Sequence, residues 1–133
     1  PDLRFDGVLN AELVSPWHEE IAYLLFTGSK VMQEAVFFHR ASATLIVTDL
    51  IENFSPKAFG GWKMSLANAA GVVAPHGKMP LAWRLSFTFH TREAKQHLDT
   101  MLTWQPHQIV MAHGERITEN GTAFLRRSFS WLQ

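Results

Sequence analysis

The sequence predicts one α/β domain in which a layered sheet carries helices on one face. The expected order of elements is β-β-β-α-α-β-α, because short β-rich runs come first and amphipathic helical patterns follow. A length of 133 residues, with 47% hydrophobic and 18% charged residues, suits a single folded domain over 1–133.

Three strands are expected near the start of the chain, after an extended or looped opening over residues 1–16. Residues 20–27 (EIAYLLFT) form a short apolar run that ends at Gly28-Ser29. Residues 34–39 (EAVFFH) and 44–50 (TLIVTDL) are rich in β-branched and aromatic residues. The short polar link between them predicts a hairpin with a four-residue loop.

The middle of the chain alternates between helical and irregular patterns. Ser55-Pro56 offers a helix start, and apolar residues recur at helical spacing until Gly71, although Gly60-Gly61 weakens this helix. Residues 71–80 are rich in proline and glycine and are expected to be irregular. The aromatic-rich run 81–89 does not distinguish a helix from a strand.

The C-terminal part has the clearest helical periodicity. Thr91 is expected to cap a helix that Gln105-Pro106 ends. The apolar face of this helix consists of residues at helical spacing, namely Ala94, Leu98, Met101 and Leu102. Residues 108–112 (QIVMA) are continuously apolar, which predicts a strand buried on both faces, and a last helix is expected over 122–132.

Composition excludes several classes of function. Twelve basic residues balance twelve acidic ones, so nucleic acid is not expected as a partner. The chain has no cysteine, so any metal must use histidine and carboxylate ligands. No apolar run reaches the roughly 18 residues that span a bilayer, and residues 1–11 lack a signal-peptide pattern, so we expect no membrane partner and a cytoplasmic location. A start at Pro1 fits either removal of the initiator Met or a fragment of a longer protein.

Asp49 and His113 are the main candidates for a functional site. Each follows an apolar strand, so each is expected at the carboxyl end of its strand, the edge where ligands gather in layered α/β folds. The alternative for Asp49 is a carboxylate that caps the backbone of residues 50–53. The alternative for His113 is a turn histidine that bonds a neighbouring carbonyl group.

The seven histidines contain no H-x-H or H-E-x-x-H spacing, so no local sequence motif pre-assembles a metal site. His39 is the additional candidate ligand because it ends a strand, with a hydrogen-bonded structural role as its alternative. His97 is expected on the partly exposed face of a helix.

Other patterns indicate structure rather than catalysis. No G-x-S-x-G elbow or Gly-rich phosphate loop occurs, so serine hydrolase chemistry is unsupported. The aromatic residues are expected to pack in the core rather than to line a ligand pocket. This set comprises Trp62, Trp83, Phe87, Phe89, Trp104, Phe129 and Trp131.

Residues 36–53 (VFFHRASATLIVTDLIEN), 109–115 (IVMAHGE) and 124–132 resemble an uncharacterised family of metallo-β-lactamase-fold-like proteins. The resemblance covers the C-terminal half of that αββα sandwich. It implies that Asp49 bridges two metal ions and that His113 completes the second metal site, with Zn as the metal and Fe or Mn as its alternatives. For this chain alone, the absence of any cofactor is an equal expectation. The H-x-H-x-D-H motif of the N-terminal half is absent, and Gly28-Ser29 stands where the family has a Gly-His pair.

Half of a sandwich would leave one apolar sheet face uncovered. Several hundred Å² of exposed apolar surface would forfeit on the order of 10 kcal/mol, so we expect a homodimer or a missing N-terminal segment to cover it. The leading hypothesis is a metallo-hydrolase-like domain of unknown small-molecule substrate, with a real or vestigial metal site and a bound water as the nucleophile. The alternative is a non-catalytic binding or oligomerisation module, or a fragment that lacks the N-terminal metal motif.

Overall fold

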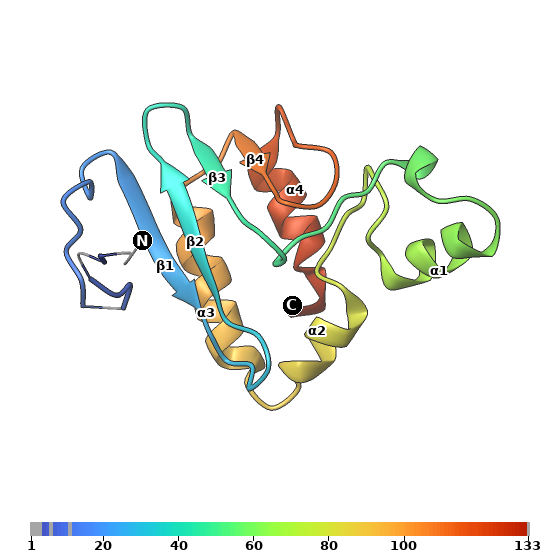
Figure 1. Cartoon of the computed structure of the whole chain (residues 1–133), viewed down its shortest axis with the longest axis horizontal. Coiled ribbons are helices and arrows are strands. Elements are labelled where there is room, and N and C mark those ends of the chain that lie inside the picture. The colour runs from blue at the N-terminus through green and yellow to red at the C-terminus, as the bar shows by residue number, and fades with distance from the viewer. Residues whose placement is uncertain (1–3, 6, 11, 133) are drawn as a thin grey trace.

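The computed structural model describes residues 4–5, 7–10 and 12–132 and has a mixed α/β architecture built on a four-stranded sheet (Figure 1). The strands are β1 (Ile21–Phe26), β2 (Glu34–His39), β3 (Thr44–Ile46) and β4 (Gln108–Val110), in spatial order β1-β2-β3-β4. The strand β2 pairs antiparallel with both β1 and β3, whereas β3 and β4 are parallel. The carboxyl ends of β3 and β4 therefore meet at one edge of the sheet.

The β2–β3 hairpin is confirmed with the expected four-residue loop, but β3 is shorter than the predicted run 44–50. Regular pairing stops after Ile46 because the next amides take other partners. The pairing that ends is the one with β2. Val47 N still bonds to β4, donating to Val110 O at 2.9 Å, whereas the amides of Thr48 and Asp49 donate to the Glu34 carboxylate. A side chain of β2 therefore replaces the β2 backbone as the acceptor for this segment.

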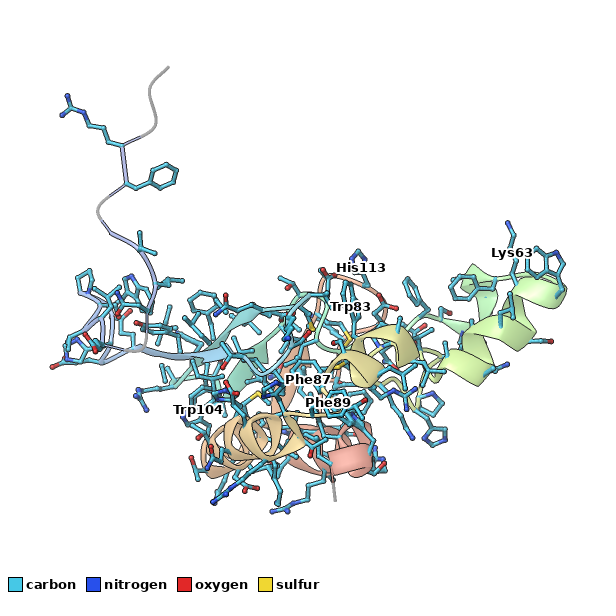
Figure 2. All side chains as sticks on the ribbon, turned by 90° about the horizontal axis from the view of Figure 1, so that it is seen from below. Lys63, Trp83, Phe87, Phe89, Trp104 and His113 are labelled. Atoms are coloured by element: carbon cyan, nitrogen blue, oxygen red, sulfur yellow. The ribbon has the colours of Figure 1, made fainter. Side chains whose placement is uncertain are left out.

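The helices α3 (Thr91–Thr103) and α4 (Gly121–Ser128) lie below the sheet in Figure 2, and the hydrophobic core fills the space between them. The core side chains of the strands come from alternate positions, as the two-residue period of a strand requires. Phe26, Leu45 and Ile109 are fully buried there. Thr91 is the first residue of α3 rather than its cap, since His90 occupies the N-cap position without a side-chain bond.

The strand β4 is not buried on both faces, contrary to the sequence-based prediction. Ile109 is fully buried, but Val110 is 40% exposed. The reason is topological: β4 is the last strand of the sheet, and within the described residues the helices α3 and α4 cover only the face to which Ile109 points. A continuous apolar run is therefore no proof of a central strand.

The outer face of the sheet carries a row of apolar side chains. Strand register aligns Tyr23 with Phe37, Phe37 with Ile46, and Ile46 with Val110. Trp17 packs against the first two of these rings, at centroid distances of 5.6 and 6.0 Å. Trp17 thus covers the part of the row on β1 and β2, whereas the part on β3 and β4 is exposed.

The expected helix from residue 55 to residue 70 is divided in two. A 3-10 turn (Pro56–Ala58) precedes α1 (Trp62–Ala70), and Gly61, with φ of 53°, separates them. Gly71 adopts the left-handed conformation, with φ of 74°, and ends α1 as predicted. This segment has a small apolar cluster of its own and projects away from the sheet in Figure 1.

The run 81–89, which the sequence left untyped, contains the short helix α2 (Leu81–Ser86). A 3-10 turn (Ser130–Leu132) follows α4, so the expected last helix over 122–132 is interrupted at Phe129. None of the helices in the described part of the chain has the length and apolar character that a bilayer crossing requires.

The prediction that all seven aromatic residues belong to the core is wrong for two of them. Phe87 and Phe129 are fully buried, and Trp104 stacks on Phe38 at a centroid distance of 5.5 Å. Trp62 is 69% exposed and Phe89 is 93% exposed. The projecting position of α1 and the end of α2 account for this exposure, because neither residue faces the main core.

Candidate functional site

Asp49 and His113 lie side by side at the carboxyl edge of β3 and β4. His113 Nε2 is 3.0 Å from Asp49 Oδ1, and both side chains are about half exposed. The parallel register explains this position: Ile46 pairs with Val110, and each candidate follows its strand by the same number of residues. The expectation that these two residues share one edge of the sheet therefore agrees with the structure, while their role is a separate question.

Glu34 fixes the backbone on which Asp49 sits. Its Oε1 accepts from Thr48 N at 2.5 Å and its Oε2 accepts from Asp49 N at 2.9 Å. The Glu34 side chain is buried, and desolvation raises its pKa, while the hydrogen bonds from the Thr48 and Asp49 amides oppose that shift. A buried carboxylate on β2 thus orients Asp49 through the backbone.

Asn53 fixes the backbone of His113 in a similar way. Asn53 N donates to His113 O at 3.0 Å, and Glu115 N donates back to Asn53 O at 2.7 Å. The buried Asn53 side chain donates to Glu115 O at 2.8 Å and accepts from Gly77 N at 3.1 Å. The segment after Asp49 therefore returns alongside the segment after β4 and holds the two candidate residues in register.

Two further side chains complete the surroundings of the pair. Burial raises the pKa of Glu52, the neighbouring charge of His113 lowers it, and Asp49 raises it. Glu52 therefore lies within electrostatic range of both residues. The Phe54 ring packs against the His113 imidazole, with a centroid distance of 6.2 Å and an interplanar angle of 28°. The pair therefore has the Glu52 carboxyl group within electrostatic range and the Phe54 ring against its imidazole.

The sequence reasoning missed Glu34, Glu52 and Asn53 as parts of this site. Glu34 carried a signal that could have identified it, because it shares the inward face of its strand with Val36 and Phe38. A carboxylate on an inward face must find hydrogen-bond donors. Asn53 carried no comparable signal, since its side-chain partners are more than twenty residues away.

His39 does not join the pair. It ends β2, which runs antiparallel to β3, so it lies opposite Thr44 at the start of β3, whereas Asp49 follows the end of that strand. Its Nδ1 lies 2.8 Å from Ser42 Oγ within the hairpin loop. The expectation that His39 could supply a further ligand beside Asp49 and His113 is therefore corrected, and the hydrogen-bonded alternative describes its observed contacts.

The described side chains around the pair provide fewer ligands than a catalytic metal ion usually has. Among the described residues, no group of three or more histidine and acidic side chains is arranged to hold a metal ion. A catalytic zinc site usually has three protein ligands and one open position. Asp49 and His113 therefore fit two positions of such a site, and Glu52 lies near them without completing it.

His97 belongs to a second polar cluster, on the helix side of β1. Thr27 Oγ1 donates to Glu93 Oε1 at 2.5 Å and lies 2.9 Å from His97 Nε2. The imidazole also packs against Phe26 at a centroid distance of 5.4 Å. Burial lowers the pKa of His97, and the Glu93 carboxylate opposes this shift.

Comparison with known proteins adds no name to this site. No protein-family model, curated protein or solved structure matches the chain.

Proposed function

We propose that this chain is a metallo-hydrolase-like domain in which Asp49 and His113 bind a divalent metal ion, with Zn favoured and Fe or Mn as alternatives. The observation that carries the proposal is the 3.0 Å approach of His113 Nε2 to Asp49 Oδ1 at the ends of two parallel strands. Carboxylate oxygen and imidazole nitrogen are ordinary ligands of Zn²⁺. The resemblance to the C-terminal half of the metallo-β-lactamase sandwich assigns the same two residues to metal.

A bound ion would supply a water molecule with a lowered pKa as the nucleophile. Asp49 and His113 would hold the ion on backbone segments that Glu34 and Asn53 keep in place. Burial raises the pKa of Glu52, which would favour the transfer of a proton to its carboxylate. Phe54 restricts solvent on one side of the imidazole.

Asp49 and His113 provide two ligands, whereas a catalytic zinc site usually has three from protein, so a partner would have to supply the third. We propose that a homodimer or an N-terminal segment covers the outer sheet face and contributes the missing ligand. Ile46 and Val110 are 38% and 40% exposed on that face, at the end of β3 and β4 from which the chain leads to Asp49 and His113. Covering these apolar side chains would be favourable.

Metal binding tests the proposal directly. Protein purified without chelators is titrated with Zn²⁺ by calorimetry, and its metal content is measured by elemental analysis. Asp49→Asn and His113→Gln should each abolish saturable binding. His39→Gln is the matched control, because it also removes one imidazole from a strand end, and it should bind as the parent does. Absence of saturable Zn²⁺ binding, or binding that both site variants retain, would refute the proposal.

The second candidate is a non-catalytic binding or oligomerisation module. The observation that favours it is the set of large apolar side chains exposed on α1 and on and beside α2, which are Trp62, Leu66, Leu81, Leu85 and Phe89. Exposed apolar surface of this kind marks interaction sites. Sedimentation velocity separates the cases: an assembly that dissociates on Leu85→Lys but not on Val110→Lys, together with no metal binding, would support the module.

A further inference from the structure

A hollow on the helix side of the molecule has a mainly apolar surface with basic residues in its lining. It lies between the irregular segment 74–80 and the end of α4 and has a volume of about 260 Å³. His76 and Lys78 line it from the segment, and Arg127 lines it from α4, with Phe124 and Ser128 between them. We propose that this hollow binds a small molecule that carries a phosphate group.

The positive charges of the hollow lack carboxylate partners among the described residues. The ion pairs of those residues are Lys95–Asp99, His97–Glu93 and His113–Asp49, and none of them includes a residue of the hollow. The backbones of Glu52 and Lys78 pair, yet their side chains form no ion pair in the described part of the chain. Cationic side chains grouped around a hollow create a positive potential that attracts anions.

A further guanidinium group strengthens this potential. A β-carbon built on Gly71 would lie 3.5 Å from both Arg84 Nη2 and Lys78 Cδ, so the two basic side chains flank one glycine. Arg84 Nη2 donates to Ala70 O at 2.8 Å, while its buried Nε has no partner among the described residues. Arg84 therefore adds charge next to Lys78 without being neutralised by a described carboxylate.

The frame of the hollow is held in place before any ligand binds. The buried Ser128 Oγ donates to Gly77 O at 2.7 Å and joins α4 to the irregular segment. On the other side, Gly77 N donates to the buried Asn53 Oδ1 at 3.1 Å. The Arg127 guanidinium lies over the Phe124 ring, 5.9 Å from its centroid, and this contact orients the guanidinium. A backbone frame that is already fixed loses little entropy when a ligand binds.

Size and charge define the class of ligand. A hollow of about 260 Å³ is smaller than the usual range for drug-sized ligands, so a compact molecule is required. The two cationic side chains in the lining, Lys78 and Arg127, match a phosphate dianion better than a single carboxylate. The balanced charge of the whole chain argues against a nucleic acid as the source of the phosphate.

The hollow is distinct from the Asp49–His113 pair. His113 is on the upper side of the sheet in Figure 2, whereas α4, which supplies Phe124, Arg127 and Ser128, lies below it. Binding of phosphate and binding of metal can therefore be tested separately, and the failure of one leaves the other intact.

The test measures binding of inorganic phosphate and pyrophosphate by calorimetry and by NMR shifts at low ionic strength. Lys78→Gln and Arg127→Gln should each weaken binding by about tenfold or more, the size expected from one charge-assisted hydrogen bond. Arg127→Lys keeps the charge but loses the fork of donors, so it should weaken binding less than Arg127→Gln does. Arg126→Gln is the matched control, because it removes the same charge from the adjacent residue of α4, which lines a different hollow with His107 and Asn120.

Circular dichroism melts of all four variants verify that each is folded. Equal weakening by Arg126→Gln would show non-specific charge attraction and overturn the proposal, as would absence of phosphate binding by the parent. Equal affinity for acetate would overturn the phosphate assignment. Co-sedimentation with phosphatidic acid vesicles, without binding of free phosphate, would replace the small ligand by a lipid headgroup and would also overturn the proposal as stated.

Discussion

Gly114, the residue after His113, gives the sharpest test of how the candidate site is built. Its φ of 109° is a conformation that residues with a side chain rarely adopt. A β-carbon at this position would overlap the backbone carbonyl group of Asn53 and lie 2.7 Å from Phe54 N. The obstructing atoms belong to the backbone, so no rotation of a side chain can relieve the contact.

The expected effect of Gly114→Ala follows from these two penalties. A strained backbone conformation costs about 1–3 kcal/mol, and forcing extra atoms into a packed region costs about 1–3 kcal/mol more. The sum, about 2–6 kcal/mol, is a large fraction of the roughly 5–15 kcal/mol by which a domain is stable. Relief by backbone movement would displace His113 from Asp49, since Asn53 holds the His113 carbonyl.

Urea denaturation followed by circular dichroism measures the free energy of unfolding. The matched control is Gly60→Ala, because nothing lies within 4 Å of a β-carbon there and Gly60 is not among the glycines with positive φ. The control should change stability by less than about 0.5 kcal/mol. If Gly114→Ala also stays within that limit, the close approach of Asn53 to Gly114 is not a property of the protein in solution.

Two further predictions concern ionisable groups. Burial raises the pKa of Glu34 above its ordinary value of 4.5, so its carboxyl group contributes stability that is fully present below pH 4.5 and is lost as pH rises through the native pKa. Glu34→Gln should therefore reduce the fall in unfolding free energy between pH 4.5 and 7, measured by urea melts, whereas Glu119→Gln, at an exposed position, should leave it unchanged. Removing the Glu93 carboxylate should lower the already depressed pKa of His97 further, because Glu93 opposes the effect of burial. NMR titration of the His97 ring in Glu93→Gln tests this, with Lys95→Gln as the control on the same helix, and an unchanged or raised pKa would contradict it.

Much of the sheet could be predicted from local patterns. The β2–β3 hairpin was predictable because its strands are separated by a short polar link, and local pairing needs no distant information. The exposure of one face of β4 was not predictable, since an apolar run looks the same whether one or both faces are buried. The helix α2 was missed because its six residues are too few to establish a period.

The candidate site, like the sheet, was predictable from the sequence only in part. That Asp49 and His113 would share an edge was predicted from their positions after two apolar runs, because the carboxyl ends of strands gather ligands in layered α/β folds. The parallel pairing of β3 and β4 in the structure brings about this arrangement. The position of His39 could not be settled in this way, because its strand runs in the opposite direction and moves its end away from that edge. Direction, rather than residue type, separates the histidine that joins the site from the one that does not.

The residues that hold the pair in place depend on contacts that no local pattern encodes. Asn53 forms an isolated parallel bridge with Gly114, which extends the pairing of β3 and β4 beyond the ends of both strands. Because Asp49 and Asn53 lie on one such segment and His113 and Gly114 on the other, the separation of the pair is set by backbone hydrogen bonds rather than by attraction between the two side chains. Replacing either Asp49 or His113 should therefore leave the fold intact, whereas changes at Asn53 or Gly114 should disturb both the fold and the site.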